Sequence, residues 1–202
     1  GGQIPIALGL ALASKYKGEG RVVLCFMGDG AINEGEFHES MNLASLWQLP
    51  VLFFCENNLY GMGASVDQTL AFHEEIFKFA AGYHILSTRV DGMDVLAVRE
   101  ATAEAVESVR GNGGPFFIEA LTYRFRGHSI ADPSEYRSKA EEEKWRVKDP
   151  ILALKDRIRK EGLISDEDLA AVYHEVEREV EEAVAFAEES QFPEPESLFD
   201  DV

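Results

Sequence analysis

The fold is decided by residues 21–61, RVVLCFMGDGAINEGEFHESMNLASLWQLPVLFFCENNLYG. Residues 21–27 form a short apolar run that ends at a glycine, which is typical of a buried strand in a parallel sheet. Apolar residues then recur at helical spacing over residues 34–47, so one face of this helix can pack on the sheet. Pro50 ends the helix, and residues 51–55 form a second apolar run. The order strand, helix, strand predicts a βαβ unit.

Polar residues follow both strands of this unit. Gly28-Asp29-Gly30 closes the first strand, and Asn57-Asn58 follows the second. Because ligands bind beyond the carboxyl ends of parallel strands, we expect Asp29 and Asn58 to converge at one edge of the sheet. Carboxylate and amide oxygens are hard ligands that suit Mg²⁺ or Ca²⁺. The pattern therefore predicts a site for a divalent cation.

A phosphate group is the expected companion of such a cation, since Mg²⁺ usually binds through few protein groups together with phosphates. The backbone amides of Gly30 and Ala31 stand at a helix start, where amides and dipole favour an anion. Tyr60 lies in a loop expected over residues 59–65, and its carbonyl could supply a further metal oxygen. Each motif alone is also a common tight turn or strand end, but the pair around one βαβ unit is far more specific.

The rest of the first 140 residues continues the alternation of strands and helices. The further elements predicted there are helices at residues 4–16, 70–81 and 95–110 and strands at residues 84–90 and 116–123. Asp94 is expected to cap the helix that follows it. The pattern predicts an α/β fold with a doubly wound, mostly parallel sheet.

A long polar loop, residues 123–137, begins at the carboxyl end of the last predicted strand, on the same side as the proposed metal site. A loop of this length in a compact domain is more often functional than idle. His128 could bind a diphosphate oxygen or move a proton near neutral pH; alternatively, it is a surface histidine that Asp132 or water satisfies. The arginines of this loop could steer an acidic substrate or partner: Arg124, Arg126 and Arg137.

The last part of the chain, residues 141–202, is predicted to be a helical extension with an acidic tail, separate from a cofactor-binding α/β domain at residues 1–140. Its helices are expected at residues 141–145, 150–161 and 166–189, with Ser165 as a cap and a tail at residues 191–202. The long helix carries an apolar stripe wide enough to dock on the domain or on another subunit.

The composition excludes several classes of partner. The 202 residues include 19 basic and 37 acidic side chains, a net charge of −18, which disfavours nucleic acid and anionic membranes. We expect no membrane span and no secretory leader, hence a protein of the bacterial cytoplasm or of the mitochondrial matrix or plastid stroma. Cys25 and Cys55 fall in predicted strands, and a disulfide between them is the less favoured alternative. The glycine at position 1, so close to an apolar helix, suggests a fragment or a trimmed product.

Several motifs in this order make the chain similar to the alpha subunits of thiamine diphosphate-dependent 2-oxo acid dehydrogenases. They are GDGA at residues 28–31, ENNLYGMG at 56–63, RVDGMD at 89–94 and YRFRGHSIADPSEYR at 123–137. The resemblance covers essentially the whole chain. The FRGHS stretch and Asp132-Pro133 look most like the members that act on pyruvate, with branched-chain 2-oxo acid and acetoin members as alternatives.

The resemblance implies roles for individual residues. Mg²⁺ would be held by Asp29, Asn58 and the carbonyl of Tyr60. The diphosphate would be held by the same Asp29 and Asn58 together with Gly28, Gly30 and Ala31. His128 would bind the cofactor near its reacting end and act in catalysis. Ser129 matches a serine that mitochondrial relatives phosphorylate, but a plain loop hydroxyl is the favoured interpretation and regulation the alternative.

The resemblance also implies partners. Family members work as heterotetramers of two alpha and two beta subunits, with the site between chains, and pass the acyl unit to the lipoyl group of an acyltransferase. Family chains carry a preceding segment with further cofactor contacts, so we expect this chain alone to bind cofactor weakly and turn nothing over. A non-catalytic assembly subunit is the alternative from a different class.

Overall fold

The structure is a computed structural model that describes residues 1–200. The described chain divides into two compact units, Gly1–Leu154 and a second from Lys155 onward. The elements of the first unit are, in chain order, α1 (Gln3–Lys17), β1 (Val23–Gly28), the 3₁₀ helix η1 (Asp29–Asn33), α2 (Gly35–Leu46), β2 (Val51–Asn57), β3 (Tyr60–Gly61), β4 (Ala64–Ser65), α3 (Val66–Thr69), the 3₁₀ helix η2 (Ile76–Tyr83), β5 (Leu86–Asp91), α4 (Val95–Asn112), β6 (Phe116–Leu121) and α5 (Lys139–Arg146). Helix α6 (Pro150–Glu161) spans the boundary.

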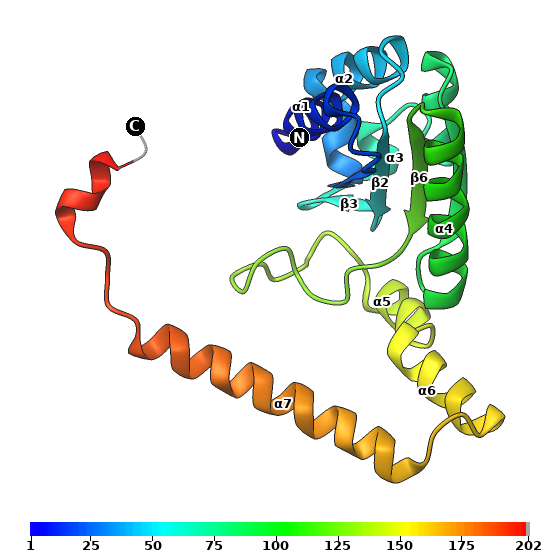
Figure 1. The fold of residues 1–202 in the computed structure, drawn as a ribbon. Coiled ribbons are helices and arrows are strands. Elements are labelled where there is room, and N and C mark those ends of the chain that lie inside the picture. The colour runs from blue at the N-terminus through cyan, green and yellow to red at the C-terminus, as the bar shows by residue number, and fades with distance from the viewer. Residues whose placement is uncertain (201–202) are drawn as a thin grey trace. The chain divides into compact units, whose positions relative to one another are not determined.

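A parallel sheet forms the centre of the first unit (Figure 1). Within residues 1–200 its strand order is β1-β2-β6-β5, and every neighbouring pair is parallel. The register pairs Gly28 with Glu56 and Glu56 with Ala120, so the strands end at one common edge. The predicted strands and the parallel α/β fold are thereby confirmed. The prediction that the first strand is buried is wrong, because β1 is an edge strand whose Leu24 and Phe26 are exposed.

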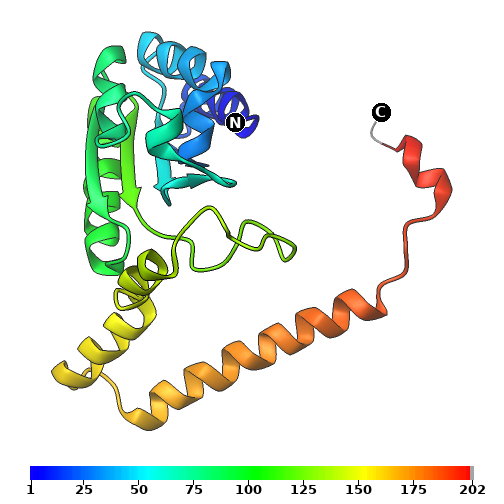
Figure 2. The ribbon, with the colours of Figure 1, turned by 180° about the vertical axis from the view of Figure 1, so that it is seen from behind.

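Helices cover both faces of the sheet, as Figures 1 and 2 show from opposite sides. Alternate strand residues such as Met27 and Phe53 pack with apolar side chains of α1 and α2 in one core cluster. The intervening residues, such as Phe54 and Ile118, pack with Ala105 of α4 in a second cluster. The fold is therefore doubly wound, as predicted.

The prediction of a continuous helix over residues 70–81 is wrong. The chain forms the short α3, then turns over residues 70–75, and only then the 3₁₀ helix η2. The amide of Phe77, which a continuous helix would direct to a carbonyl four residues earlier, donates instead to Glu119 Oε2 at 3.0 Å. Likewise, the loop predicted at residues 59–65 contains the short antiparallel hairpin β3-β4. Contacts with distant strands override the local pattern in the first of these segments.

The second unit contains α7 (Asp166–Glu189) and the 3₁₀ helix η3 (Pro195–Phe199). Ser165 caps α7 as predicted, in a capping box with Asp168. Val172, Val176 and Val180 on its apolar stripe are 53–58% exposed. The docking role of this stripe and the boundary after residue 140 stay predictions, and residues 201–202 of the predicted acidic tail lie outside the described part.

The two cysteines are free and buried. Burial raises the pKa of the Cys25 thiol and raises that of Cys55 well above its ordinary value. The less favoured disulfide is thus not formed, and both thiols act as small apolar core groups. Among the helices that the structure describes, none is both long and apolar enough to cross a membrane.

Asp94 supplies the first stability test. Its carboxylate accepts hydrogen bonds from the amides of Leu96 at 2.9 Å and Ala97 at 3.2 Å, as predicted for the cap of α4. We expect Asp94→Ala to lower the free energy of unfolding by about 1 kcal/mol, whereas Asp94→Asn, which keeps an acceptor, costs clearly less. Urea unfolding measures both, and an equal loss in the two variants would contradict the capping role.

Candidate functional site

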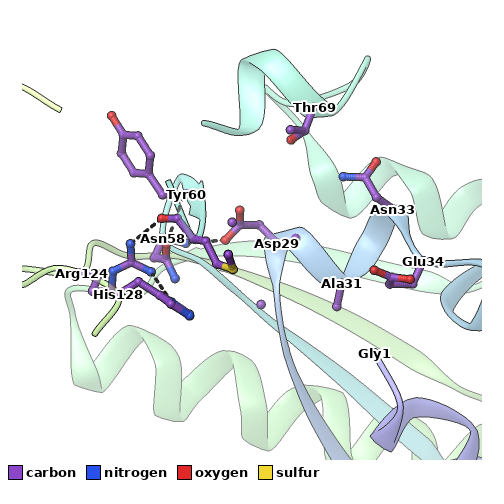
Figure 3. A pocket seen from close by; sticks show the side chains of 14 residues that line it. Gly1, Asp29, Ala31, Asn33, Glu34, Asn58, Tyr60, Thr69, Arg124 and His128 are labelled. Carbon is purple, nitrogen blue, oxygen red and sulfur yellow. Dashed lines mark hydrogen bonds between the residues drawn. The ribbon is translucent and has the colours of Figure 1, made fainter. Parts of the chain in front are cut away.

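A cavity of about 650 Å³ lies at the carboxyl edge of β1 and β2. Its lining includes every residue that is predicted to bind the metal or the cofactor: Gly28, Asp29, Gly30, Ala31, Asn58, Tyr60 and His128. Gly1, Asn33, Glu34, Gly61, Met62, Thr69 and Arg124 complete the lining, and Figure 3 shows these side chains from close by. Ser129, the alternative phosphorylation site, is exposed and lies outside this lining.

Asp29 is the most deeply buried charge of this cavity, with 1% of its surface exposed. Its Oδ1 accepts a hydrogen bond from the Asn58 amide at 3.2 Å, while Oδ2 has no partner among residues 1–200. Burial raises the pKa of Asp29, and nearby backbone amides and the Arg124 charge offset part of that effect. A buried carboxylate with a free oxygen is unfavourable by itself and suited to a cation.

The turn after β2 brings Asn58 beside Asp29. Leu59 adopts a left-handed conformation with φ of 73°, which a non-glycine residue reaches at a cost of about 1–2 kcal/mol. The side-chain oxygens of Asn57 and Asn58 hold this turn by accepting the amides of Leu59 and Tyr60, each at 3.1 Å. The second lone pair of Asn58 Oδ1 remains free for a cation.

The turn after β1 packs backbone against backbone on the hairpin. A Cβ atom on Gly30 would lie 3.3 Å from the Cα of Gly61, so this contact has little room for a side chain. The ring of Tyr60 points away from Asp29 in Figure 3, and its hydroxyl donates to Glu141 at 2.9 Å, so only the Tyr60 backbone can serve the cavity. Burial and this hydrogen bond raise the pKa of Tyr60.

Arg124 and His128 lie together beside these residues (Figure 3). Nη1 of Arg124 is 3.4 Å from Nδ1 of His128. Because arginine only donates, this contact is a hydrogen bond in the tautomer whose Nδ1 accepts and whose ring proton is on Nε2. Arg124 also donates to the carbonyl of Met62 at 2.8 Å, which ties the long loop to the hairpin.

Asp132 organises the loop around His128. It accepts hydrogen bonds from the Tyr136 hydroxyl at 2.6 Å, the His128 amide at 2.6 Å and the Ser134 amide at 2.8 Å. These bonds, that of Tyr136 foremost, lower the pKa of Asp132 to about 2. A Cβ on Gly127 would lie 2.6 Å from the Asp132 carbonyl oxygen, so this turn requires glycine. Asp132 therefore satisfies the backbone of His128, while Arg124 contacts its ring.

Residues 1–196 match the family model described as "Dehydrogenase E1 component". The chain belongs to this family. It is 45% identical over 200 residues to the human "Pyruvate dehydrogenase E1 component subunit alpha, somatic form, mitochondrial", covering 98% of this chain and 50% of that relative. It is 42% identical over 203 residues to "Pyruvate dehydrogenase E1 component subunit alpha" of Rhizobium meliloti (100% and 58%) and 39% identical over 202 residues to that of Rickettsia typhi (100% and 62%). The chain thus spans half to three-fifths of the length of these relatives.

Some features of this E1-component chain differ from the prediction or were not predicted. A steering role is wrong for Arg137, whose side chain is 1% exposed and binds Glu142 at 2.8 Å. The contacts of Arg124 to the cavity and of Asp132 to the loop backbone were also not predicted. The one available signal for Arg124 is its position, three residues after β6 ends at the ligand-binding edge.

The raised pKa of Asp29 predicts how pH affects the stability of the E1-component chain without metal. A carboxyl whose pKa is higher in the folded state binds its proton more tightly there, so its contribution to stability falls as pH rises. The fall begins near the unfolded pKa of about 3.9 and ends above the raised folded pKa. Asp29→Asn removes this loss and keeps the acceptor for the Asn58 amide.

We therefore expect the free energy of unfolding of Asp29→Asn to exceed that of the wild type by an amount that grows across this interval, reaching on the order of 1 kcal/mol. Urea unfolding in the presence of a chelator, at pH 4 to 7, measures the difference. A difference that stays constant with pH would show that the charge of Asp29 is not responsible.

Proposed function

We propose that this chain provides the diphosphate half of a thiamine diphosphate- and Mg²⁺-dependent pyruvate dehydrogenase (acetyl-transferring), as the alpha subunit of its first component. The observation that carries the proposal is the buried carboxylate of Asp29, with its free Oδ2, in one cavity with Asn58. Within residues 1–200, no three His, Cys, Asp or Glu side chains converge to hold a metal by themselves. A cation here would need phosphate oxygens or water as well, which suits Mg²⁺.

The chain offers one donor set for the cation and another for the diphosphate. Asp29, Asn58 and the Tyr60 carbonyl would hold Mg²⁺. The backbone of Gly28, Gly30 and Ala31, at the start of η1, would hold the diphosphate, with the Arg124 charge beside it. When bound, thiamine diphosphate supplies the electron sink for decarboxylating a 2-oxo acid.

His128 would serve at the reacting end. In the tautomer with its proton on Nε2, that atom is a hydrogen-bond donor, while the Arg124 contact holds the ring at Nδ1. The bond from its amide to Asp132 fixes the backbone that carries it. The chain therefore presents a positioned imidazole to the cavity.

The proposed substrate is pyruvate, because the relatives are named for it; branched-chain 2-oxo acids and acetoin remain the alternatives. The proposed partners are a beta subunit, in a heterotetramer of two alpha and two beta chains, and a lipoyl acyltransferase that accepts the acetyl unit. The exposed valine stripe of α7 is available for a protein contact. The named relatives, bacterial and mitochondrial, support a cytoplasmic or organelle-matrix location.

Ser129 has two interpretations. Its exposure makes its hydroxyl accessible to a kinase, and a phosphate there would put negative charge beside His128 and Asp132. Alternatively, it is a loop hydroxyl without a regulatory role.

Cofactor binding tests the proposal. We expect the full-length chain, assembled with its beta subunit, to bind thiamine diphosphate only when Mg²⁺ is present. Asp29→Ala and Asn58→Ala should weaken this binding by at least ten- to a hundred-fold, because each removes a metal oxygen. Calorimetry measures the affinities, and Asp67→Ala, at an exposed residue of α3, is the control. Unchanged affinity in Asp29→Ala, with full activity, would favour the non-catalytic assembly subunit.

Turnover tests the place of His128. We expect His128→Gln to lower decarboxylation of pyruvate by about a hundred-fold or more, because it removes the imidazole, which can move a proton, but keeps a hydrogen-bond donor. Cofactor affinity should change far less, since Asp29 and Asn58 remain. Steady-state assays with pyruvate and with branched-chain 2-oxo acids give both the loss and the substrate preference. Equal losses in turnover and in cofactor affinity would place His128 in binding alone.

A further inference from the structure

Glu119 is a second buried carboxylate, which does not line the cavity. It lies in β6, and none of its surface is exposed. A charge in such a place is unfavourable unless hydrogen bonds and an opposite charge compensate it. Oε1 accepts a bond from Nδ2 of Asn57 at 2.8 Å, Oε2 accepts one from the Phe77 amide at 3.0 Å, and Nε of Arg89 lies 3.7 Å from Oε1.

The bond to Glu119 determines which way the Asn57 amide faces. A carboxylate only accepts, so Nδ2 of Asn57 must point to Glu119, and Oδ1 must point the other way. That oxygen accepts the amide of Leu59 at 3.1 Å. If the amide turned over, its oxygen would face the carboxylate and its NH₂ would face the NH of Leu59, so both bonds would be lost.

The Leu59 bond in turn supports the left-handed turn of the cavity. The backbone at Leu59 has a φ of 73°, which leucine adopts rarely. Both neighbours of Leu59 line the cavity. The Asn58 amide donates to Asp29, and the Tyr60 carbonyl is a proposed metal ligand. A continuous set of contacts therefore leads from Glu119 through Asn57 and Leu59 to the pair Asp29 and Asn58.

We propose that Glu119 is a positioning residue for the cation site: it orients the Asn57 amide, and thereby holds the turn that places Asn58 beside Asp29. The inference rests on the proposed function for the metal itself. It predicts that Glu119 affects Mg²⁺ affinity although it contacts neither metal nor cofactor. A purely structural carboxylate would affect stability alone.

A pair of substitutions separates these roles. Glu119→Gln keeps the volume, but one oxygen cannot accept both the Asn57 and the Phe77 donors, so the Asn57 amide loses its fixed direction. Asn57→Asp alone sets two carboxylates against each other. Together the substitutions restore the three hydrogen bonds, though not the Arg89 ion pair: the glutamine at 119 accepts from Phe77 and donates to the aspartate at 57, which accepts from Leu59.

The experiment measures the apparent dissociation constant of Mg²⁺ at saturating thiamine diphosphate, in the full-length chain assembled with its partner subunit. We expect each single variant to weaken Mg²⁺ binding by about ten- to a hundred-fold, the usual effect of a lost outer-shell partner. The double variant should recover to within a few-fold of the wild type. Such recovery is the non-additivity that direct coupling requires.

A control and a second variant keep the outcomes distinct. Ile118→Val, at the neighbouring buried position in β6, should lower the melting temperature without changing Mg²⁺ affinity. If Glu119→Gln does not fold, Asn57→Ala tests the same link, with the same expected loss. Unchanged Mg²⁺ affinity in the foldable single variant, or no recovery in the double variant, would overturn the role of Glu119. Absence of Mg²⁺-dependent binding in the wild type would instead overturn the proposed function.

Discussion

The candidate site depends on one carboxylate that the fold keeps away from water. Asp29 directly follows β1 and is 1% exposed; within residues 1–200, only one of its oxygens has a partner. Burying an uncompensated ion costs several kcal/mol even after relaxation. A cation bound here, as proposed, would regain part of the free energy lost on burial.

The second requirement of the candidate site is a rigid turn at Leu59. A glycine at Leu59 would adopt the left-handed conformation without strain but would also leave the turn free to adopt others. Leucine is held there by the side chains of Asn57 and Asn58, and Asn57 is held by the buried Glu119. The strained conformation persists because hydrogen bonds over-determine it. Asn58, the proposed cation ligand, is thus held by bonds that reach back into the sheet.

The sequence predicts what short-range patterns control. The strands and helices with clear apolar periods agree with the prediction. The convergence of Asp29 and Asn58 also agrees, because a site at strand ends requires only the strand order. The exceptions are long-range contacts. Glu119 accepts a hydrogen bond from the Phe77 amide, 42 residues away in the sequence, where a continuous helix was predicted. Arg124 donates to the Met62 carbonyl, 62 residues away. No local period encodes which distant strand will present an acceptor to a given amide.

The charge of the chain is a reason for the proposed cation and diphosphate to share one site. With a net charge of −18, the protein repels anions at long range, and a diphosphate alone would meet Asp29 as a further like charge. At physiological ionic strength this repulsion is screened beyond about 8 Å, so contacts within the cavity decide the binding. Arg124 supplies one positive charge near Asp29, which leaves the carboxylate and a diphosphate together strongly negative. A divalent cation between them neutralises both, so each ligand makes the binding of the other favourable.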